Sequence, residues 1–576
     1  VTRLQFDNGK VFYSGNRCDR IFSNGGSSGA RGFNLTRYKE KLLFDRPRKG
    51  DDRPKAVIGI PRVLNMYENF PFWCTIFVEL GFEVRLSSTS SARLYEKGSG
   101  TIMSDSICFP AKMVHGHIMD LMEKGVDRIF YPIIVYEHFE QKGFNSFNCP
   151  IVTGYPLVIR SAIDPEGKKG IPLDAPPITF KDADLLEKSC YAYFRRFNIE
   201  RRLFFRAFDR ALTAHREYKN ALRSKSAEVM DMASREGRRV ILVVDRPYHL
   251  DRYINQGVHE TLTQMGIDVI TGDSVPLPGE TLGDVQVLTQ WEYTNRLYNA
   301  GKFANDHEDL EVVQLNSFGC GLDAIATDVL TDILKESGKN LTVIRIDEIS
   351  SPGSIKLRLR TLVESLKMNR RSGPRKRYER RSLPLFMKED RHRIILVPFF
   401  SDFYSPFAES AFAESGYRFK VLPPPDKRSL EIGLKYTNNE ICYPAIIVVG
   451  DILKALESGR YDLSRVAVGI TQTGAQCRAS NYVTLIKRGL LWAGYHIPVI
   501  TVHFKGSGLH PQPGFRLNRV NLIKTGLYSL TFADALSLMY HPILVREKRR
   551  GSAWELVRKY FDLWHMDDEK SEDKVL

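Results

Sequence analysis

Cysteines are the residues of this sequence whose positions point most clearly to chemistry. The segments SICFPAKM and EICYPAII place Cys108 and Cys442 in the same setting, before an aromatic residue, a proline and an alanine. Both cysteines precede a helix-like run that ends at a glycine. Cys320 and Cys477 also match each other, because each lies at a glycine-containing turn ahead of a helix-like segment. A helix start explains the proline but not the shared register, so we infer an internal duplication.

The other cysteines differ in setting. Cys149 lies before a proline on a loop after a strand-like segment, and Cys18 lies in the polar, glycine-rich loop SGNRCDRIFSNGG. Cys74 and Cys190 lie in segments where a cysteine most often acts as a small buried hydrophobe. The sequence contains no C-x-x-C pair, which excludes a zinc ribbon and a ferredoxin-type loop. Single, widely spaced cysteines also do not form a disulfide framework.

Thiolates that are far apart in the sequence and that the fold brings together are best suited to one kind of cofactor site. Zinc sites usually take their ligands in close pairs, and a catalytic thiol needs only one cysteine. Several thiolates that different lobes deliver to one cleft suit an iron–sulfur cluster held between those lobes. Two such half-sites, related by duplication, could place two clusters together.

Three stretches of the sequence have the pattern of elements needed to position these cysteines. Each begins with an apolar strand-like run, AVIGIP, RVILVVDRPYH or HRIILVPFF, followed by a helix that closes at glycine and a second strand. This pattern predicts an α/β fold of three related parallel-sheet units, Rossmann-like or flavodoxin-like. The cysteines then lie at strand ends and helix starts, the edge where such sheets bind ligands. Helix N-termini there stabilise thiolates.

The expected division of the chain follows from these three units. Between the first two lies a charged segment of helical character, and a basic linker precedes the third. The expected ranges are an N-terminal segment with the Cys18 loop at 1–54, a first α/β unit at 55–165, a helical insertion at 166–238, a second unit at 239–366, the linker at 367–390, a third unit at 391–520 and a helical C-terminal segment at 521–576.

Composition indicates a globular protein of several domains. The chain has 576 residues, 43% of them hydrophobic and 26% charged. No apolar run reaches the ~18 residues of a membrane helix, and the start has no apolar signal core, so we expect a cytoplasmic protein without a membrane partner. The sequence begins without Met in a strand-like run, which indicates a fragment or a chain split from a longer one.

The formal net charge of +15 does not by itself indicate nucleic-acid binding. Much of the excess lies in local clusters, of which the densest is the run RRSGPRKRYERR from Arg370 to Arg381. A solvated linker is the first interpretation of that run, and attraction to an acidic partner or a phosphate-bearing ligand is the second. We expect no nucleic-acid partner.

Several segments together resemble the 2-hydroxyacyl-CoA dehydratase superfamily. They are IGIPRVLNMYENFPFW, SICFPAKMVHGHI, RPYHLDRYINQGV, NSFGCGLDA, NNEICYPAIIVVGD and CRASNY. More closely, they resemble the dehydratase-like half of large acyl-CoA dehydratase activase-related proteins and the double-cubane cluster proteins. The resemblance covers roughly residues 10 to 520.

This resemblance implies an iron–sulfur cofactor, either a [4Fe-4S] cluster held by three cysteines or two linked cubanes as an [8Fe-9S] cluster. In that family an ATP-hydrolysing activase of the actin-like fold supplies low-potential electrons under anaerobic conditions. The implied cluster ligands are Cys108, Cys149 and Cys320 in one half and Cys442 and Cys477 in the other, with Cys18 as the candidate that completes the second set.

The function implied by the resemblance is an iron–sulfur reductase or a dehydratase-like lyase that acts on an acyl-CoA or a small reducible molecule. The alternatives are a non-catalytic electron-transfer or scaffold subunit of a dehydratase/activase system, and a nucleotide-binding α/β protein with incidental cysteines. The chain has no P-loop and no G-x-G-x-x-G in the right context, so we expect the activase to be fused upstream or separate.

Polar residues near the cysteines could support such a site. His117 is expected on a solvated face of the helix after Cys108, whereas other residues share a helix face with a cysteine, end a strand, or directly follow a cysteine. These candidates are Lys112, His115, Tyr248, His249 and Arg478.

Overall fold

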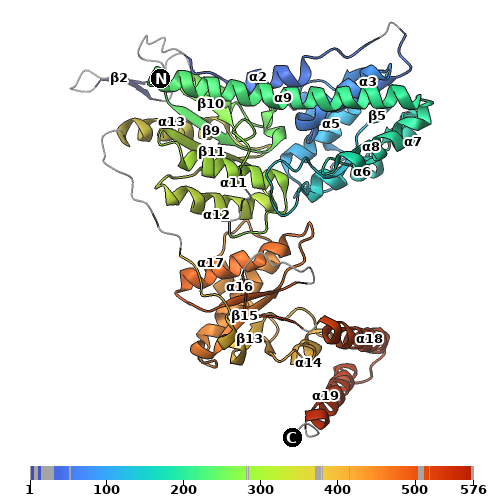
Figure 1. Ribbon diagram of the computed structural model, residues 1–576, viewed down its shortest axis with the longest axis vertical. Coiled ribbons are helices and arrows are strands. Elements are labelled where there is room, and N and C mark those ends of the chain that lie inside the picture. Colours follow the sequence, from blue (N-terminus) through green and yellow to red (C-terminus); the bar gives the residue numbers. More distant parts are fainter. Residues whose placement is uncertain are drawn as a thin grey trace.

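The chain folds around three α/β units, a long helix and a helical C-terminal arm (Figure 1). The computed structural model describes residues 2–5, 11–14, 31–50, 53–279, 282, 285–369, 378, 381–413, 415–503, 511–517 and 519–572. Within these ranges, every helix is too short or too polar to cross a membrane.

Three four-stranded parallel sheets share one strand order, in which the first strand lies between the second and the third, and the fourth follows the third. This order confirms the predicted α/β class with three related flavodoxin-like units. In sheet order, the strands are β4 (Glu83–Leu86), β3 (Val57–Ile60), β5 (Arg128–Phe130) and β7 (Leu173–Asp174); β10 (Asp268–Thr271), β9 (Val240–Val244), β11 (Leu310–Ser317) and β12 (Thr342–Ile346); and β14 (Arg418–Val421), β13 (Ile394–Val397), β15 (Val466–Thr471) and β16 (Val499–Val502).

Helices cover these sheets, so central strands such as β9 are buried along their whole length. Strand β9, with the sequence VILVV, is buried at all five positions, as expected for a parallel strand covered on both faces. The helices are α3 (Met66–Glu79), α4 (Ala92–Ser99), α5 (Phe109–Glu123) and α6 (Pro150–Ala162) in the first unit; α10 (Val258–Gln264), α11 (Glu292–Asn305), α12 (Gly321–Glu336) and α13 (Pro352–Asn369) in the second; and α14 (Ala408–Ala413), α15 (Lys427–Tyr436), α16 (Tyr443–Glu457) and α17 (Tyr482–Ala493) in the third.

The segment between the first two units contains the longest helix, α9 (Arg201–Arg235). Its buried residues recur every three or four positions, and this apolar face packs on α3 and on α2 (Leu35–Phe44). The same segment supplies strand β7 to the first sheet. The remaining elements of this segment are α7 (Pro165–Lys169), β8 (Pro177–Thr179), α8 (Ala183–Phe194) and the short helix η1 (Arg195–Phe197). Strand β8 pairs with β6 (Ile133–Tyr136) of the first unit.

The two ends of the chain add smaller elements. A hairpin opens the chain, and two helices project from the third unit at its end (Figure 1). The strands of the hairpin are β1 (Thr2–Gln5) and β2 (Val11–Ser14), and the two helices are α18 (Arg519–Leu544) and α19 (Ser552–Glu572). The short helices not yet given are η2 (Pro247–Leu250), η3 (Lys388–His392), η4 (Ser405–Phe407), η5 (Leu463–Arg465) and η6 (Arg478–Asn481).

Helix packing supports the inferred duplication of the first and third units. Helices α4 and α5 approach so closely that a Cβ on Gly116 would lie 1.9 Å from a carbonyl oxygen of α4. A Cβ on Gly450 would likewise lie 1.7 Å from a carbonyl oxygen of α15, which packs on α16. Each glycine stands eight residues after the matching cysteine, Cys108 or Cys442. The same helix crossing therefore occurs in both units.

The third unit meets the second through α17, which faces α12 (Figure 1). The Arg488 guanidinium of α17 lies 2.9 Å from the Asp332 carboxylate of α12. Asn481 accepts a hydrogen bond from the Leu288 amide at 2.6 Å and donates one to the Leu288 carbonyl at 3.3 Å. These contacts fix the end of the third unit that carries Cys477.

Candidate functional site

The five cysteines expected at helix starts are all N-cap residues, and they occupy only two positions of the common α/β unit. Cys108 caps α5 and Cys442 caps α16, and both helices lead into the third strand of their units. Cys149, Cys320 and Cys477 follow the third strand and cap α6, α12 and η6, on the way to the fourth strand.

The equivalence of Cys149 with Cys320 and Cys477 was not predicted from the sequence. Its local sequence, Asn-Cys-Pro, differs from Gly-Cys-Gly and Gln-Cys-Arg, so only the strand order reveals the match. In the second unit, Trp291 caps α11 at the position where the other two units have Cys108 and Cys442. Five of six equivalent positions are therefore cysteine.

The thiols of the first and second units influence one another. Burial, together with the neighbouring Cys149, raises the pKa of Cys108 to about 12. Burial also raises the pKa of Cys320, which interacts with both of those thiols. A Cβ on Gly319 would lie 3.7 Å from the Ser106 carbonyl oxygen, so the loops that carry Cys320 and Cys108 adjoin.

Tyr248 lies among these three thiols. Burial raises its pKa well above the ordinary value, and Cys320, Cys108 and Cys149 each add to that shift. Only 4% of Tyr248 is exposed. Its phenol is therefore a protonated hydrogen-bond donor near the cysteines at neutral pH.

Next to Tyr248, Arg246 and His249 are also buried. The Arg246 guanidinium forms an ion pair with Asp323 in the first turn of α12, the helix that Cys320 caps. His249 Nε2 lies 2.9 Å from the hydroxyl of Ser317, at the end of β11. Burial lowers the pKa of His249 well below its usual range, so this side chain is neutral.

The two cysteines of the third unit share one neighbour. The Cys442 sulfur lies 3.0 Å from the Tyr482 hydroxyl. Burial raises the pKa of Tyr482, and Cys442 and then Cys477 raise it further. Cys442 is half-buried, whereas Cys477 is exposed.

The loop that carries Cys477 contacts the loop that carries Cys149. Gln476 Nε2 donates a hydrogen bond to the Asn148 carbonyl at 3.4 Å. The Asn148 side chain in turn accepts a hydrogen bond from the Cys149 amide at 2.8 Å. A residue directly before one cysteine is therefore bonded to the residue directly before another.

The same loop also contacts the start of α12. A Cβ on Gly321 would lie 1.7 Å from a guanidinium nitrogen of Arg478, so the arginine covers this glycine. Cys320 and Cys477 directly precede these two residues. The third unit thus brings its Cys477 loop against the loops of Cys149 and Cys320, and Tyr482 links Cys442 to the same junction of loops.

Among the residues that the structure describes, no group of three or more His, Cys, Asp or Glu could hold a metal ion. A cubane makes a different demand, because each thiolate binds a different iron and the ligand sulfurs lie roughly 6–7 Å apart. The donor set at the junction consists of sulfur atoms at helix starts with two arginines nearby, and this chemistry fits an anionic iron–sulfur cluster.

The polar candidates Lys112 and His115 on α5 both have partners other than the cysteines. Lys112 forms a buried ion pair with Glu348. His115 contacts the Thr101 hydroxyl at 2.8 Å and the Tyr155 hydroxyl at 3.1 Å, and burial lowers its pKa to about 4. These contacts give both residues a packing role.

The expectation that His117 lies on a solvated face was wrong. His117 is fully buried, with its ring nitrogens 2.7 Å from the Ser87 hydroxyl and 3.0 Å from the Ser90 hydroxyl. The close approach of α4 to α5 removes this face from solvent.

Of the three remaining cysteines, two are buried, as their sequence settings predicted, and one lies outside the described residues. Cys74 and Cys190 are buried in the core, and burial raises the pKa of Cys74 to about 11. All seven described cysteines are free thiols. Cys18 lies outside the described residues, as does most of the basic run from Arg370 to Arg381.

A buried carboxyl group next to the Cys149 loop, that of Glu137, was not predicted from the sequence. Glu137 accepts hydrogen bonds from the side-chain amides of Asn65, Asn69 and Asn148, the last two at 3.2 Å. Burial, together with the nearby Glu68, raises its pKa to about 7. The three asparagines are the only signal, and nothing in their spacing connects them to one acid.

The fold and the junction define an α/β protein of three flavodoxin-like units with five cysteines at helix starts. Residues 57–275 match the family model described as CoA enzyme activase uncharacterised domain (DUF2229). The matched range includes Cys108 and Cys149 and ends before Cys320. The match supports the predicted relation to CoA enzyme activase systems at this general level. A search of curated proteins found no match.

Proposed function

We propose that the chain holds an iron–sulfur cluster, [4Fe-4S] or [8Fe-9S], and works with an ATP-dependent activase in an acyl-CoA dehydratase/activase system. The observation that supports this proposal is that five cysteines from three α/β units cap helices, and that loops which carry them contact one another. A single catalytic thiol would not need this arrangement, and a zinc site would not distribute its ligands in this way.

The proposed ligands form two sets that follow the duplication. Cys108, Cys149 and Cys320 would hold one part of the cluster, and Cys442 and Cys477 the other. Cys18 is the proposed sixth ligand. When bound, such a cluster supplies low-potential electron transfer and, at an iron without a protein ligand, a position for substrate.

The surrounding residues would prepare the thiols for this role. Cluster binding requires thiolates, whereas burial keeps Cys108 and Cys320 protonated in the free protein. The helix N-termini and the Arg478 guanidinium favour the negative charge that forms when the protons leave. Tyr482 is placed to donate a hydrogen bond to the Cys442 sulfur, which tunes the potential of such centres, and Tyr248 lies near the other three thiols.

The proposed reaction is reduction or dehydration of an acyl-CoA or a small reducible molecule. The rival proposal is a non-catalytic electron carrier, and the exposed position of Cys477 favours access by a redox partner. Both proposals require that electrons reach the site from an activase that hydrolyses ATP.

Activase-dependent reduction tests the proposal and separates it from its rival. The anaerobically reconstituted chain is mixed with an activase of this system, a reductant and ATP, and its visible absorbance is followed. ATP-dependent bleaching, absent with a non-hydrolysable ATP analogue, is the expected result. Substrate turnover would then identify an enzyme, and bleaching without turnover a carrier. Absorbance that is unchanged by ATP would contradict the proposal.

A further inference from the structure

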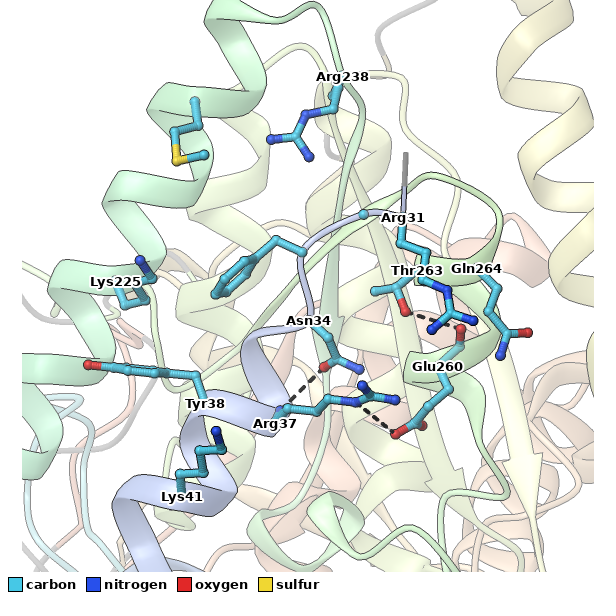
Figure 2. Close-up of a pocket in the computed structure, with 13 residues that line it drawn as sticks. Arg31, Asn34, Arg37, Tyr38, Lys41, Lys225, Arg238, Glu260, Thr263 and Gln264 are labelled. Carbon is cyan, nitrogen blue, oxygen red and sulfur yellow. Dashed lines mark hydrogen bonds and ion pairs between the residues drawn. The ribbon is translucent and has the colours of Figure 1, made fainter. Parts of the chain in front are cut away.

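A second candidate site lies away from the cysteines, in a pocket between α2, α9 and α10. The pocket has a volume of about 640 Å³, which is within the range of small-molecule sites. Figure 2 shows its labelled side chains, with Lys225 of α9 and Arg238 on one side and Arg31 on the other.

The lining of this pocket is strongly basic. Five cations and one carboxylate line it: Arg31, Arg37, Lys41, Lys225, Arg238 and Glu260. Three of the cations already have acidic neighbours, since Arg37 lies 3.9 Å from Glu260, Lys225 contacts Glu228 and Arg238 contacts Asp268. Arg31 and Lys41 make no ion pair within the described part of the chain.

Aromatic rings complete the lining. Phe33 and Tyr38 are half-buried and line the same cavity. The Lys225 amino group lies 5.3 Å from the Phe33 ring centroid, so a cation and an aromatic face are combined on one wall. A ligand that carries both a flat ring and negative charge would use both features.

The wall that carries Phe33 is held firmly by the second unit. The Phe33 amide donates to the Asp268 carboxylate at 2.5 Å, and the Phe33 carbonyl accepts from the Val269 amide at 2.9 Å. A Cβ on Gly32 would lie 1.9 Å from the Ile267 carbonyl oxygen, so this position admits only glycine. The backbone of this wall is therefore held in place without a ligand.

We infer that this pocket binds a small organic phosphate with an aromatic base, a nucleoside polyphosphate or the adenosine end of coenzyme A. Arginine and lysine side chains are the usual partners of phosphate oxygens, and a base can stack on aromatic faces. Part of the chain's excess positive charge thereby gains a specific role.

The site is separate from the junction of thiols. Arg238 precedes β9 and Asp268 begins β10, so the pocket lies at the amino edge of the second sheet. Cys320 follows the carboxyl end of β11, at the opposite edge. Five residues of β9 span about 16 Å between these edges. Binding in this pocket therefore goes beyond the proposed function and does not depend on it.

Calorimetric titration of the full chain with ADP, GDP and coenzyme A tests the inference. Lys225→Glu and Lys41→Glu should each weaken binding about tenfold or more, because each replaces attraction with repulsion. Arg206→Glu is the matched control, since it makes the same sign change at an exposed position of α9 about 28 Å away. Thermal unfolding of each variant checks that it is folded.

Tighter binding of ADP or GDP than of coenzyme A would assign a free nucleotide, and the reverse order would assign the coenzyme. Phe33→Ala should weaken ADP binding but leave pyrophosphate binding unchanged. The inference is wrong if none of the three ligands binds, or if Lys225→Glu and Arg206→Glu have the same effect. Binding of a single-stranded oligonucleotide without binding of the small ligands would also overturn it.

Discussion

Arg478 covers Gly321 so closely that a Cβ on the glycine would lie 1.7 Å from a guanidinium nitrogen. The arginine belongs to the third unit and the glycine to the second, and each directly follows a cysteine. The guanidinium therefore lies over the start of α12, the helix that Cys320 caps. We expect this arginine, which is not itself a ligand, to influence the proposed cluster site.

Gly321→Ala should displace the Arg478 guanidinium from the start of α12 and lower the iron content of the reconstituted protein. The added methyl group cannot fit unless Arg478 moves. Gly154→Ala is the control, because a Cβ there meets no atom within 4 Å although α6 is headed by another proposed ligand. Iron per chain and the unfolding temperature are measured for both variants. Equal iron contents would show that the contact does not shape the site.

Cys442→Ser should lower iron content and change the visible spectrum, whereas Cys74→Ser should leave both nearly unchanged. Cys442 caps α16 at the junction, while Cys74 lies in the core of the first unit and contacts the Pro47 carbonyl at 3.4 Å. Iron analysis after anaerobic reconstitution is the measurement. If both variants retained the iron of the parent chain, Cys442 would not be a ligand.

Tyr482→Phe should keep the cluster but lower its midpoint potential. The hydroxyl lies 3.0 Å from the Cys442 sulfur, and a hydrogen bond to sulfur stabilises the reduced form of such a centre. Tyr495→Phe, in the same unit, provides the control. Spectroelectrochemical titration measures both potentials, and an unchanged value in Tyr482→Phe would mean that the hydroxyl does not act on the site.

Glu137 should make the free energy of unfolding decrease with pH between about 4.5 and about 7. Its pKa is raised in the folded chain, so the folded state binds more protons than the unfolded state in this window. The stabilisation is full below the unfolded pKa and is lost as the pH rises through the folded pKa. The size of the loss is up to about 3 kcal/mol.

Glu137→Gln should remove this contribution, because the amide does not titrate. Urea unfolding of both proteins at pH 5 and pH 8 isolates the effect of Glu137 from that of other buried acids such as Glu292, whose pKa burial raises to about 8. Parallel pH profiles for the two proteins would show that Glu137 has an ordinary pKa.

Local sequence predicted the fold class and the helix starts because both depend on short-range patterns. The apolar strand of β9 and the proline after Cys108 are such signals. The buried ion pairs of Glu68 with Lys219 and Arg296 join positions 151 and 228 residues apart, and no local pattern encodes them. The burial of His117 likewise depends on how closely α4 approaches.

The candidate site shows the same division. The equivalence of Cys108 and Cys442 can be recognised from their similar local sequences. The equivalence of Cys149 and Cys320 can be recognised only from the strand order. The contact of Gln476 with Asn148 depends on how the units pack, as does the basic pocket around Phe33. Spacing along the chain carries no information about such contacts between units.

Iron and acid-labile sulfide in the anaerobically purified chain test the central claim most directly. We predict about eight iron atoms per chain for linked cubanes, or about four for a single cubane, with sulfide in similar amount. Both values should fall when Cys108 and Cys320 are replaced together by serine. A folded chain without iron or sulfide, even after reconstitution with both, would contradict the account.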